Sequence, residues 1–395
     1  MKIHTVKRGD SLASIAEEYG IAKELLGRIN GISEREELCV GEELFITLPT
    51  RTYKVARGDT AERIALRFGV RKNTLYALNP HIAKSGVSPG ETLILHVAEP
   101  AAATAASLGV VYRGTEEEKL KAALPYLTYV SVSEAVADDG RLRHIFDSQR
   151  ALKIINGSAK IPLMRVTDVG CGKKYRSKAS REKFIAELVG AAGKKGYKGI
   201  TLAVGGSARS SDADFTEFLM ELRRKMIGED LILFTECDEN SPDYLSELAD
   251  GAVFSYDRCG TDTEGDFCKC ERAAAIKFAK DSESSKSFFD LPPFAYCGGE
   301  YITWEEAMAL ARRYRAEINT DEKTLLSSYD YKGKRVIFPS LKNIKARLEL
   351  SSELGFMGIS FDIMRVPQRQ LYMLGAHARC VNYTGFSSRE GCSRD

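Results

Sequence analysis

Long apolar runs are absent from this 395-residue sequence. Without an uninterrupted apolar stretch of about 18 residues, no segment has the pattern of a membrane-spanning helix. The opening residues MKIHTVKRGDS also lack the apolar segment of a secretory signal. We therefore expect neither a signal peptide nor a membrane partner.

An excess of charge of one sign is also missing, because 57 basic residues stand against 55 acidic ones. The formal net charge of +2 gives no electrostatic reason to expect a nucleic-acid partner. The length of the chain predicts two or three domains with a sizeable core.

The cysteines lack the even number and regular spacing of a secreted disulfide framework. Nine are scattered along the chain, so we expect reduced thiols made in a cytosol. Cys259, Cys268 and Cys270 gather in the segment DRCGTDTEGDFCKC, where a metal site is conceivable, but C-x-x-C pairs and nearby histidines are missing. We therefore expect no metal and no cofactor.

The N-terminal quarter of the chain contains a repeat. The segment HTVKRGDSLASIAEEYGI at 4–21 superposes on YKVARGDTAERIALRFGV at 53–70 with a constant offset of 49 residues. The same offset carries Asn30 onto Asn79 and Gly41 onto Gly90. Residues 1–50 and 51–97 are therefore expected to be two copies of one small domain.

Each copy has the pattern of a strand, two helices and a second strand. Ser11 and Thr60 are good N-cap residues ahead of the first helix, and Gly20 and Gly69 end it. The copies differ in charge, since residues 1–50 carry six basic and nine acidic residues, whereas 51–97 carry eight and three. Identical ligand preference is therefore not expected.

This plan resembles the LysM module over residues 2–49 and 52–97, through V-x-x-G-D-[ST], I-A-x-x-[YF]-G, the central Asn and G-x-x-L. The resemblance implies binding of peptidoglycan or another chitin-like glycan that contains N-acetylglucosamine. The implied groove lies between the Gly-Asp-Ser/Thr loop and the loop after the second helix. Its implied contact residues are Gly9, Asp10, Ser11, Asn30, Gly58, Asp59, Thr60 and Asn79. Side chains such as Asp10 and Asn30 could instead only shape turns and caps, so the loop backbone is the better candidate.

Residues 98–108 form an Ala-rich, Pro-containing linker, after which strands and amphipathic helices alternate. This alternation over residues 109–378 predicts an α/β fold, a (β/α)8 barrel of the TIM type, followed by a C-terminal tail at 379–395. Residues 315–340 are predicted to be an insertion before the last helix and strand. The predicted strands are 109–113, 128–133, 161–167, 199–204, 230–235, 251–256, 288–296 and 358–363.

The order of features in this domain resembles glycoside hydrolase family 18, in its branch of spore germination or cortex-lytic hydrolases. GYKGI leads into the fourth strand, ADGAVFSYD forms the sixth, and ARLELSSELGFMGISF leads into the eighth. The family signature D-x-x-D-x-D-x-E, laid on this chain, falls on Lys198, Thr201, Ala203 and Gly205. The resemblance therefore implies that the Asp position is Ala203, that the acid position is Gly205, and that no catalytic residue remains.

Polar residues at other strand ends predict a residual cleft in the barrel, because ligands bind at the carboxyl ends of barrel strands. Tyr256 matches the family's sixth-strand Tyr, and Asp362 replaces the Trp expected under the sugar. A relocated acid among the carboxylates stays open, as does a role in helix caps or loop anchors. A phosphate cradle in GGSARSSD is a weaker alternative to a helix N-cap. The cleft residues are Asp168, Glu236, Tyr256, Asp257 and Asp362.

These patterns predict a glycan-binding protein of the spore envelope or cell wall with a degenerate, non-catalytic barrel. The alternative is an active cortex peptidoglycan hydrolase of the N-acetylglucosaminidase type that uses a relocated acid. Other spore-coat proteins are candidate partners. A protein without a signal peptide fits deposition on the spore after synthesis in the cytoplasm, and a cytoplasmic location is the alternative.

Overall fold

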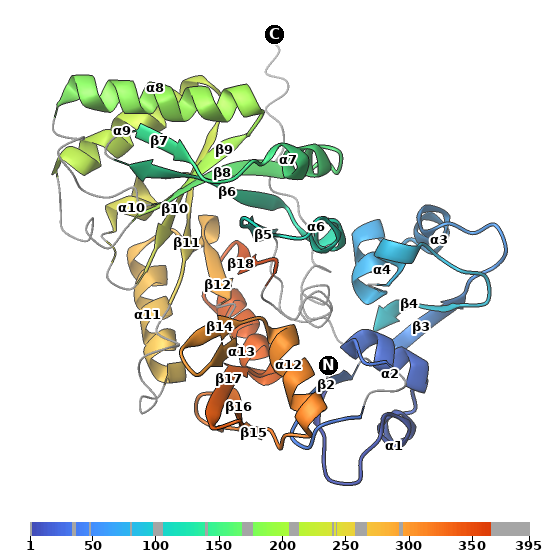
Figure 1. The fold of residues 1–395 in the computed structure, drawn as a ribbon. Coiled ribbons are helices and arrows are strands. Elements are labelled where there is room, and N and C mark those ends of the chain that lie inside the picture. The colour runs from blue at the N-terminus through green and yellow to red at the C-terminus, as the bar shows by residue number, and fades with distance from the viewer. Residues whose placement is uncertain are drawn as a thin grey trace.

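The computed structural model contains two small modules that lie against a barrel (Figure 1). None of the helices in its described portion is both long and apolar enough to cross a membrane. The structure describes residues 2–33, 37–46, 49–79, 81–97, 106–138, 141–167, 177–204, 213–238, 241, 243–256, 267–291 and 295–364.

The two modules share the predicted order of strand, helix, helix and strand. In each module the two strands pair antiparallel, and the helices cover one face of the pair. The second module has an additional short helix, α5, that the sequence pattern did not predict. The first module consists of β1 (Lys2–Thr5), α1 (Leu12–Glu18), α2 (Lys23–Asn30) and β2 (Glu43–Ile46). The second consists of β3 (Pro49–Lys54), α3 (Ala61–Phe68), α4 (Lys72–Leu78), α5 (Ile82–Ser85) and β4 (Thr92–Val97).

Eight parallel strands form the closed barrel, which confirms the predicted fold class. They pair in chain order, and β5 closes the ring by pairing with both β6 and β18. The first strand begins at Ala106, three residues before the predicted start at 109. The strands are β5 (Ala106–Val111), β6 (Tyr129–Asp138), β8 (Ile161–Thr167), β9 (Gly199–Ala203), β10 (Ile232–Cys237), β11 (Gly251–Phe254), β12 (Phe288–Leu291) and β18 (Gly358–Asp362).

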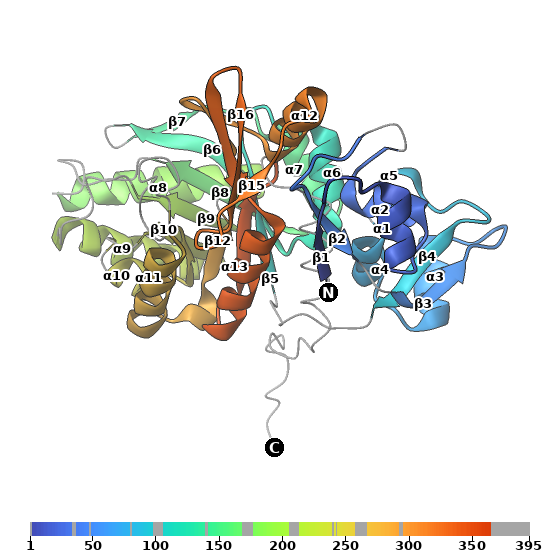
Figure 2. The same cartoon turned by 90° about the horizontal axis from the view of Figure 1, so that it is seen from below.

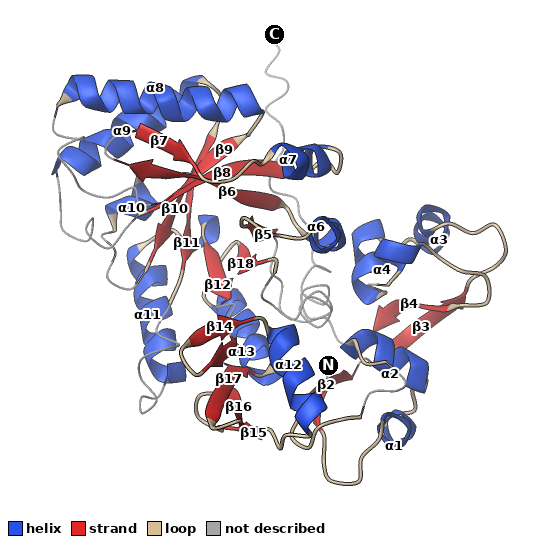
Figure 3. Cartoon of the chain, viewed as in Figure 1, coloured by secondary structure: helices blue, strands red, loops and turns tan. Residues whose placement is uncertain are grey.

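Helices enclose the ring of strands (Figure 3). The longest, α8, begins after Ser177, whose hydroxyl accepts from Ser180 N, and ends at Gly196, whose φ of 80° suits a residue without a Cβ. A short strand, β7 (Arg141–His144), pairs with the end of β6. The helices are α6 (Glu117–Ala123), the 3-10 turn η1 (Leu124–Tyr126), α7 (Gln149–Asn156), α8 (Lys178–Lys195), α9 (Ala213–Gly228), α10 (Tyr244–Glu247), α11 (Phe267–Asp281), η4 (Ser284–Lys286) and α13 (Leu341–Glu353).

The two ends of the barrel interior differ in chemistry. Tyr129, Phe234 and Phe288 meet inside the barrel with ring centroids 5.4–5.7 Å apart, and with Leu163 and Val253 they fill its amino-terminal part. Side chains on a strand alternate between its two faces. The inward positions two residues further along these strands are therefore the ones that form the carboxyl end.

The insertion between β12 and α13 is larger than predicted. It contains a five-stranded antiparallel sheet and α12, whereas the sequence pattern placed its start at 315 and gave the helix at 304 to the barrel. The apolar face of α12, with Trp304, Met308 and Ala311, packs on Tyr329 and Phe338 of this sheet instead. Figure 2 places the insertion and the β6–β7 hairpin at the same end of the barrel. The elements are β13 (Ala295–Cys297), β14 (Glu300–Ile302), α12 (Trp304–Tyr314), β15 (Asn319–Thr320), β16 (Leu326–Tyr331) and β17 (Lys334–Pro339).

Both modules share a hydrophobic core with the barrel. Ile29 and Phe45 of the first module and the matched Leu78 and Ile94 of the second belong to the same buried cluster as Leu120 on α6. The cores of both modules are therefore continuous with the core of the barrel.

Candidate functional site

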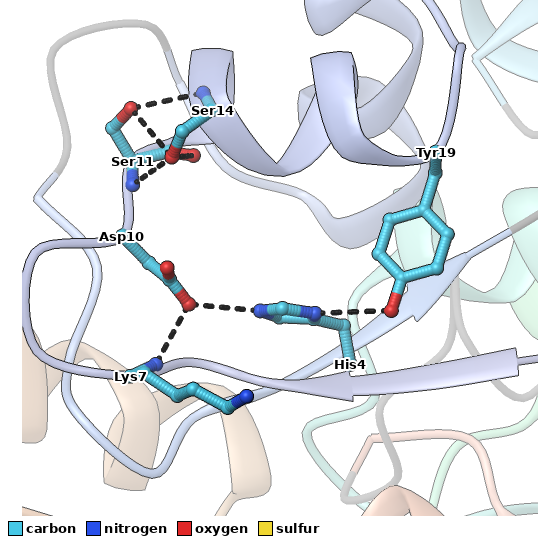
Figure 4. Close-up of polar contacts among 6 residues, drawn as sticks. All are labelled: His4, Lys7, Asp10, Ser11, Ser14 and Tyr19. Carbon is cyan, nitrogen blue, oxygen red and sulfur yellow. Dashed lines mark hydrogen bonds and ion pairs between the residues drawn. The ribbon is translucent and has the colours of Figure 1, made fainter.

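The Gly-Asp turn of the first module is held by one carboxylate (Figure 4). Asp10 Oδ2 accepts from Lys7 N at 2.8 Å and from His4 Nε2 at 2.9 Å. With that nitrogen donating, Nδ1 of a neutral His4 accepts from the Tyr19 hydroxyl at 3.1 Å. The backbone N–H of Lys7, followed by the His4 ring, lowers the pKa of Asp10. The carboxylate thus shapes the turn from within.

The residue after this turn caps α1. Ser14 N donates to Ser11 Oγ at 3.1 Å, and Ser11 N donates to Ser14 Oγ at 2.9 Å, which forms a reciprocal capping box. In the second module Arg63 N donates to Thr60 Oγ1 at 3.3 Å. The side chains of Ser11 and Thr60 therefore serve the helix ends.

The turn of the second module uses the same carboxylate with other partners. Asp59 Oδ2 accepts from the Tyr53 hydroxyl at 2.6 Å and from Ala56 N at 2.9 Å, and Arg67 pairs with Oδ1 at 3.3 Å. The hydrogen bond from Tyr53 contributes most to lowering the pKa of Asp59, and the hydrogen bond from the Ala56 amide contributes next. Tyr53 and Arg67 stand where the first module has His4 and Glu18.

Asn30 and Asn79 lie inside their modules, 3% and 1% exposed. Asn30 Nδ2 donates to the carbonyl oxygens of Leu26 and Phe45, each at 3.0 Å, and Phe45 N donates to Asn30 Oδ1 at 2.7 Å. Asn79 makes the same three bonds, to Leu75 and Ile94. These amides thus fasten the second helix to the last strand, which is the structural role that the sequence left open for their side chains.

The exposed part of each turn is its backbone. Gly9 and Gly58 have φ of 94° and 87°, and no atom lies within 4 Å of the place where a Cβ would stand. Because the side chains of Asp10 and Asp59 are engaged within their modules, the groups that a ligand can meet at these turns include the backbone of the two exposed glycines. This arrangement agrees with the backbone being the better candidate for sugar contacts.

The fourth barrel strand presents no carboxylate from its described residues. Ser131 Oγ donates to Thr201 Oγ1 at 3.2 Å across the barrel interior, so Thr201 faces inward and Ala203 does too. Gly205, the expected position of the acid, lies outside the described residues. The inward position next to Ala203 on β10 is Glu236.

Glu236 is fully engaged by an arginine that the sequence did not single out. Arg165 on β8 donates to both carboxylate oxygens, from Nε at 2.5 Å and from Nη2 at 2.7 Å. Its guanidinium also lies 5.4 Å from the centroid of the Tyr112 ring, and burial raises the pKa of that phenol to about 12. Both carboxylate oxygens of Glu236 therefore already accept N–H donors from Arg165.

Asp290, at the carboxyl end of β12, is a second residue that sequence reasoning missed. Its oxygens accept from Ser360 Oγ and, at 3.2 Å, from Ser255 Oγ. Burial, aided by the negative charge of Glu236, raises the pKa of Asp290 to about 7. The predicted strand 288–296 ran through this residue, so its place at a strand end was not visible.

The other predicted cleft residues fall in different places. Asp362 is buried at the end of β18, and its Oδ1 accepts from Met364 N at 2.8 Å. Tyr256 follows the end of β11, is buried, and belongs to the cluster that includes Phe254 and Phe278. Ser255 beside it donates to Asp290. A place for Tyr256 in the cleft stays a prediction. Asp168 and Asp257 lie outside the described residues.

Within the described residues, no group of three or more His, Cys, Asp or Glu side chains could hold a metal ion. The side chains of Cys259, Cys268 and Cys270 lie outside that part of the structure. Cys39, Cys237 and Cys297 are free thiols.

The LysM domain family model matches this chain twice, at residues 4–47 and 53–95. These matches coincide with the two modules. A search of curated protein sequences finds no match.

Solved structures share the fold of most of this chain. The Bacillus megaterium QM B1551 spore cortex-lytic enzyme SleL has a TM-score of 0.73 at 21% identity, with 94% of this chain and 96% of that chain covered. The Bacillus cereus SleL has a TM-score of 0.74 at 21% identity, covering 95% and 98%. A chitinase from Chromobacterium violaceum ATCC 12472 matches 69% of this chain and 99% of its own, with a TM-score of 0.60 at 17% identity. The chain therefore carries two LysM domains followed by a (β/α)8 barrel similar in fold to spore cortex-lytic enzymes and chitinases.

Proposed function

We propose that this protein binds the N-acetylglucosamine-containing glycan of peptidoglycan through its LysM domains. The observation that carries the proposal is the pair of LysM matches, each with an exposed Gly-Asp turn whose aspartate is engaged internally. A turn that its own aspartate holds in place suits a ligand rich in hydroxyl and acetamido groups, because binding then costs little ordering of the protein.

The barrel of this protein, on the same proposal, does not cleave the glycan by the family's usual chemistry. That chemistry needs a carboxylic acid that protonates the glycosidic oxygen. Ala203 faces the interior on the fourth strand, and both oxygens of the neighbouring Glu236 accept from Arg165. These contacts support a barrel that serves as a platform for the modules.

The proposed place of action is the spore envelope or cell wall, with other spore-coat proteins as neighbours. The support is the likeness in fold to two spore cortex-lytic enzymes over nearly the full length of each chain.

A second candidate function, an active peptidoglycan hydrolase, is favoured by Asp290. A pKa raised to about 7 keeps this carboxyl protonated in weak acid, as a general acid requires. It also faces the barrel interior at a strand end, where catalytic groups of such barrels lie. Asp290 is thus the described residue to which a relocated acid is assigned.

Co-sedimentation of the full-length chain with purified sacculi tests the binding proposal. The chain is expected to pellet with the sacculi, and soluble N-acetylglucosamine oligosaccharides are expected to release it. A chain that stays in the supernatant contradicts the proposal, and so does one whose pelleting is insensitive to the oligosaccharides.

A further inference from the structure

The two modules carry matched turns just before their last strands. We name Cys39–Glu42 and Ser88–Glu91 the wall turns, since each borders the Gly-Asp turn of its module. In the first, Val6 N donates to Glu42 O and Gly41 N donates to Val6 O, both at 2.8 Å. In the second, Val55 makes the same two bonds, with Glu91 and Gly90, both at 2.8 Å. Each wall turn lies in the loop that leads to the last strand of its module, and this loop is one side of the groove that the LysM resemblance implies.

The wall turn of the first module is covered by the insertion of the barrel. Ile318 N donates to Val40 O at 2.8 Å, and a Cβ on Gly41 would overlap the Ile318 carbonyl oxygen. Cys39 is 3% exposed and packs in the core of the insertion. The backbone on this side of the first groove is therefore already occupied.

Charged pairs reinforce this dock. Arg312 Nη2 donates to Glu42 Oε1 at 2.6 Å, with the Glu42 side chain 2% exposed. Lys342 N donates to Glu43 Oε2 at 3.1 Å, and Arg315 pairs with Glu37 at 2.8 Å. Three acidic residues of the first module, Glu37, Glu42 and Glu43, thus pair with basic residues of the insertion and of α13.

The wall turn of the second module is open. Ser88, Pro89 and Gly90 are exposed, and no atom lies within 4 Å of the place of a Cβ on Gly90. Glu91 pairs inside the module with His81 at 2.5 Å. Figure 1 shows α3 and the outer ends of β3 and β4 projecting away from the barrel and the insertion.

We propose that the two LysM domains divide their roles. The second presents the open glycan groove, and the first is closed by the insertion and acts as the dock that fixes the second to the barrel. This inference rests on the proposed glycan binding, and it assigns that binding to residues 54–60 and 86–91.

Hydrogen exchange on the full-length chain, with and without chitohexaose, tests the assignment. Added oligosaccharide is expected to slow exchange in 54–60 and 86–91 and to leave 5–11 and 37–42 unchanged. Equal slowing in both modules overturns the division of roles alone. Absence of binding, or slowing confined to the barrel, overturns the proposed glycan binding as well.

A matched pair of variants tests whether the dock closes the first groove. Gly41→Ala and Gly90→Ala carry the same backbone strain, because the two φ values are 84° and 85°, but only Gly41 meets Ile318. Gly41→Ala is expected to release the insertion and make exchange in 5–11 sensitive to chitohexaose. Gly90→Ala is expected to leave 5–11 insensitive. A Gly41→Ala chain that keeps its fold by circular dichroism, shows faster exchange in 37–42 and still lacks this response overturns the closed-groove inference.

Discussion

The two LysM domains have the same internal structure but lie in different surroundings. Both fasten their last strand with a buried asparagine, and both shape the Gly-Asp turn with one aspartate. Their wall turns differ, since the first lies under the insertion and the second is exposed. The repeat therefore fixes the internal structure of each module, whereas the residues that differ between copies decide which surface stays free.

The charge difference between the copies has the same explanation. Glu42 and Glu43 of the first module pair with Arg312 of the insertion and Lys342 of α13, respectively. The matched positions of the second module are Glu91, which pairs inside its own module, and the uncharged Thr92. The difference in net charge between the copies suggests different ligands. In the first copy, however, the acidic residues Glu42 and Glu43 serve to dock the module within the chain.

The largest effect is expected from breaking the buried pair of the dock. Arg312→Ala leaves the buried Glu42 carboxylate without its charged partner, which costs about 3–5 kcal/mol of unfolding free energy. The matched control is Lys72→Ala, which removes an exposed pair with Glu62 of the second module and costs about 0–1 kcal/mol. Urea unfolding of the full-length chain measures both. Equal losses of unfolding free energy in the two variants would contradict the role of the buried Arg312–Glu42 pair in docking the first module.

The two buried asparagines, Asn30 and Asn79, are expected to contribute equally to the free energy of unfolding. Asn30→Ala leaves the buried N–H of Phe45 without its side-chain acceptor, and Asn79→Ala does the same to Ile94. Each change costs about 2–4 kcal/mol, because buried backbone groups lose their hydrogen bonds. Thermal and urea unfolding measure the two losses. A difference of more than about 1.5 kcal/mol between them contradicts the idea of a shared internal design.

Acid is expected to loosen both Gly-Asp turns in the same pH range. The folded pKa of Asp10 and that of Asp59 lie below the ordinary value of about 3.9. Their stabilising contribution is thus present above about pH 4 and is lost as the pH falls through the folded pKa. Amide signals of Lys7 and Ala56, followed by NMR from pH 5 to pH 2, report this loss. Signals that stay unchanged to pH 2 would remove the role assigned to the carboxylates.

The smallest effect is expected at Leu66, which is 85% exposed on α3. Leu66→Glu places there the residue type that the first module has at Glu17. Leu and Glu have similar helix propensities, so the unfolding free energy changes by less than about 0.5 kcal/mol. A loss of more than 1.4 kcal/mol, a tenfold change in the unfolding equilibrium, would reveal a contact that the second module makes through this face.

Much of the fold could be predicted from local sequence. Eight apolar strand segments alternate with amphipathic helices, and all eight strands form the barrel. The boundary of the insertion could not be predicted, because the apolar face of α12 has the same pattern as that of a barrel helix. The surface that such a face packs against is formed by residues well beyond the helix in the sequence, such as Tyr329 and Phe338.

The site was less predictable than the fold. The bond between Arg165 and Glu236 joins residues 71 positions apart on strands that do not pair, and no local pattern signals it. The position of Asp290 near a strand end was not predicted, because the predicted strand 288–296 extends five residues beyond the end of β12. Asn30 and Asn79 were found by the repeat, but the repeat cannot distinguish a residue kept for the internal structure from one kept for a ligand.

Release of reducing ends from purified spore cortex peptidoglycan by the unmodified full-length chain, measured between pH 5 and pH 8, tests the central claim most directly. The claim is that the chain binds glycan without cleaving it, so release is expected to equal that of a sample without protein. A working general acid alone contributes about 10²–10⁴-fold to a rate, which makes the two outcomes easy to separate. Turnover that falls as the pH rises through about 7, and that disappears in Asp290→Asn but not in Glu236→Gln, would contradict the claim and identify Asp290 as the acid.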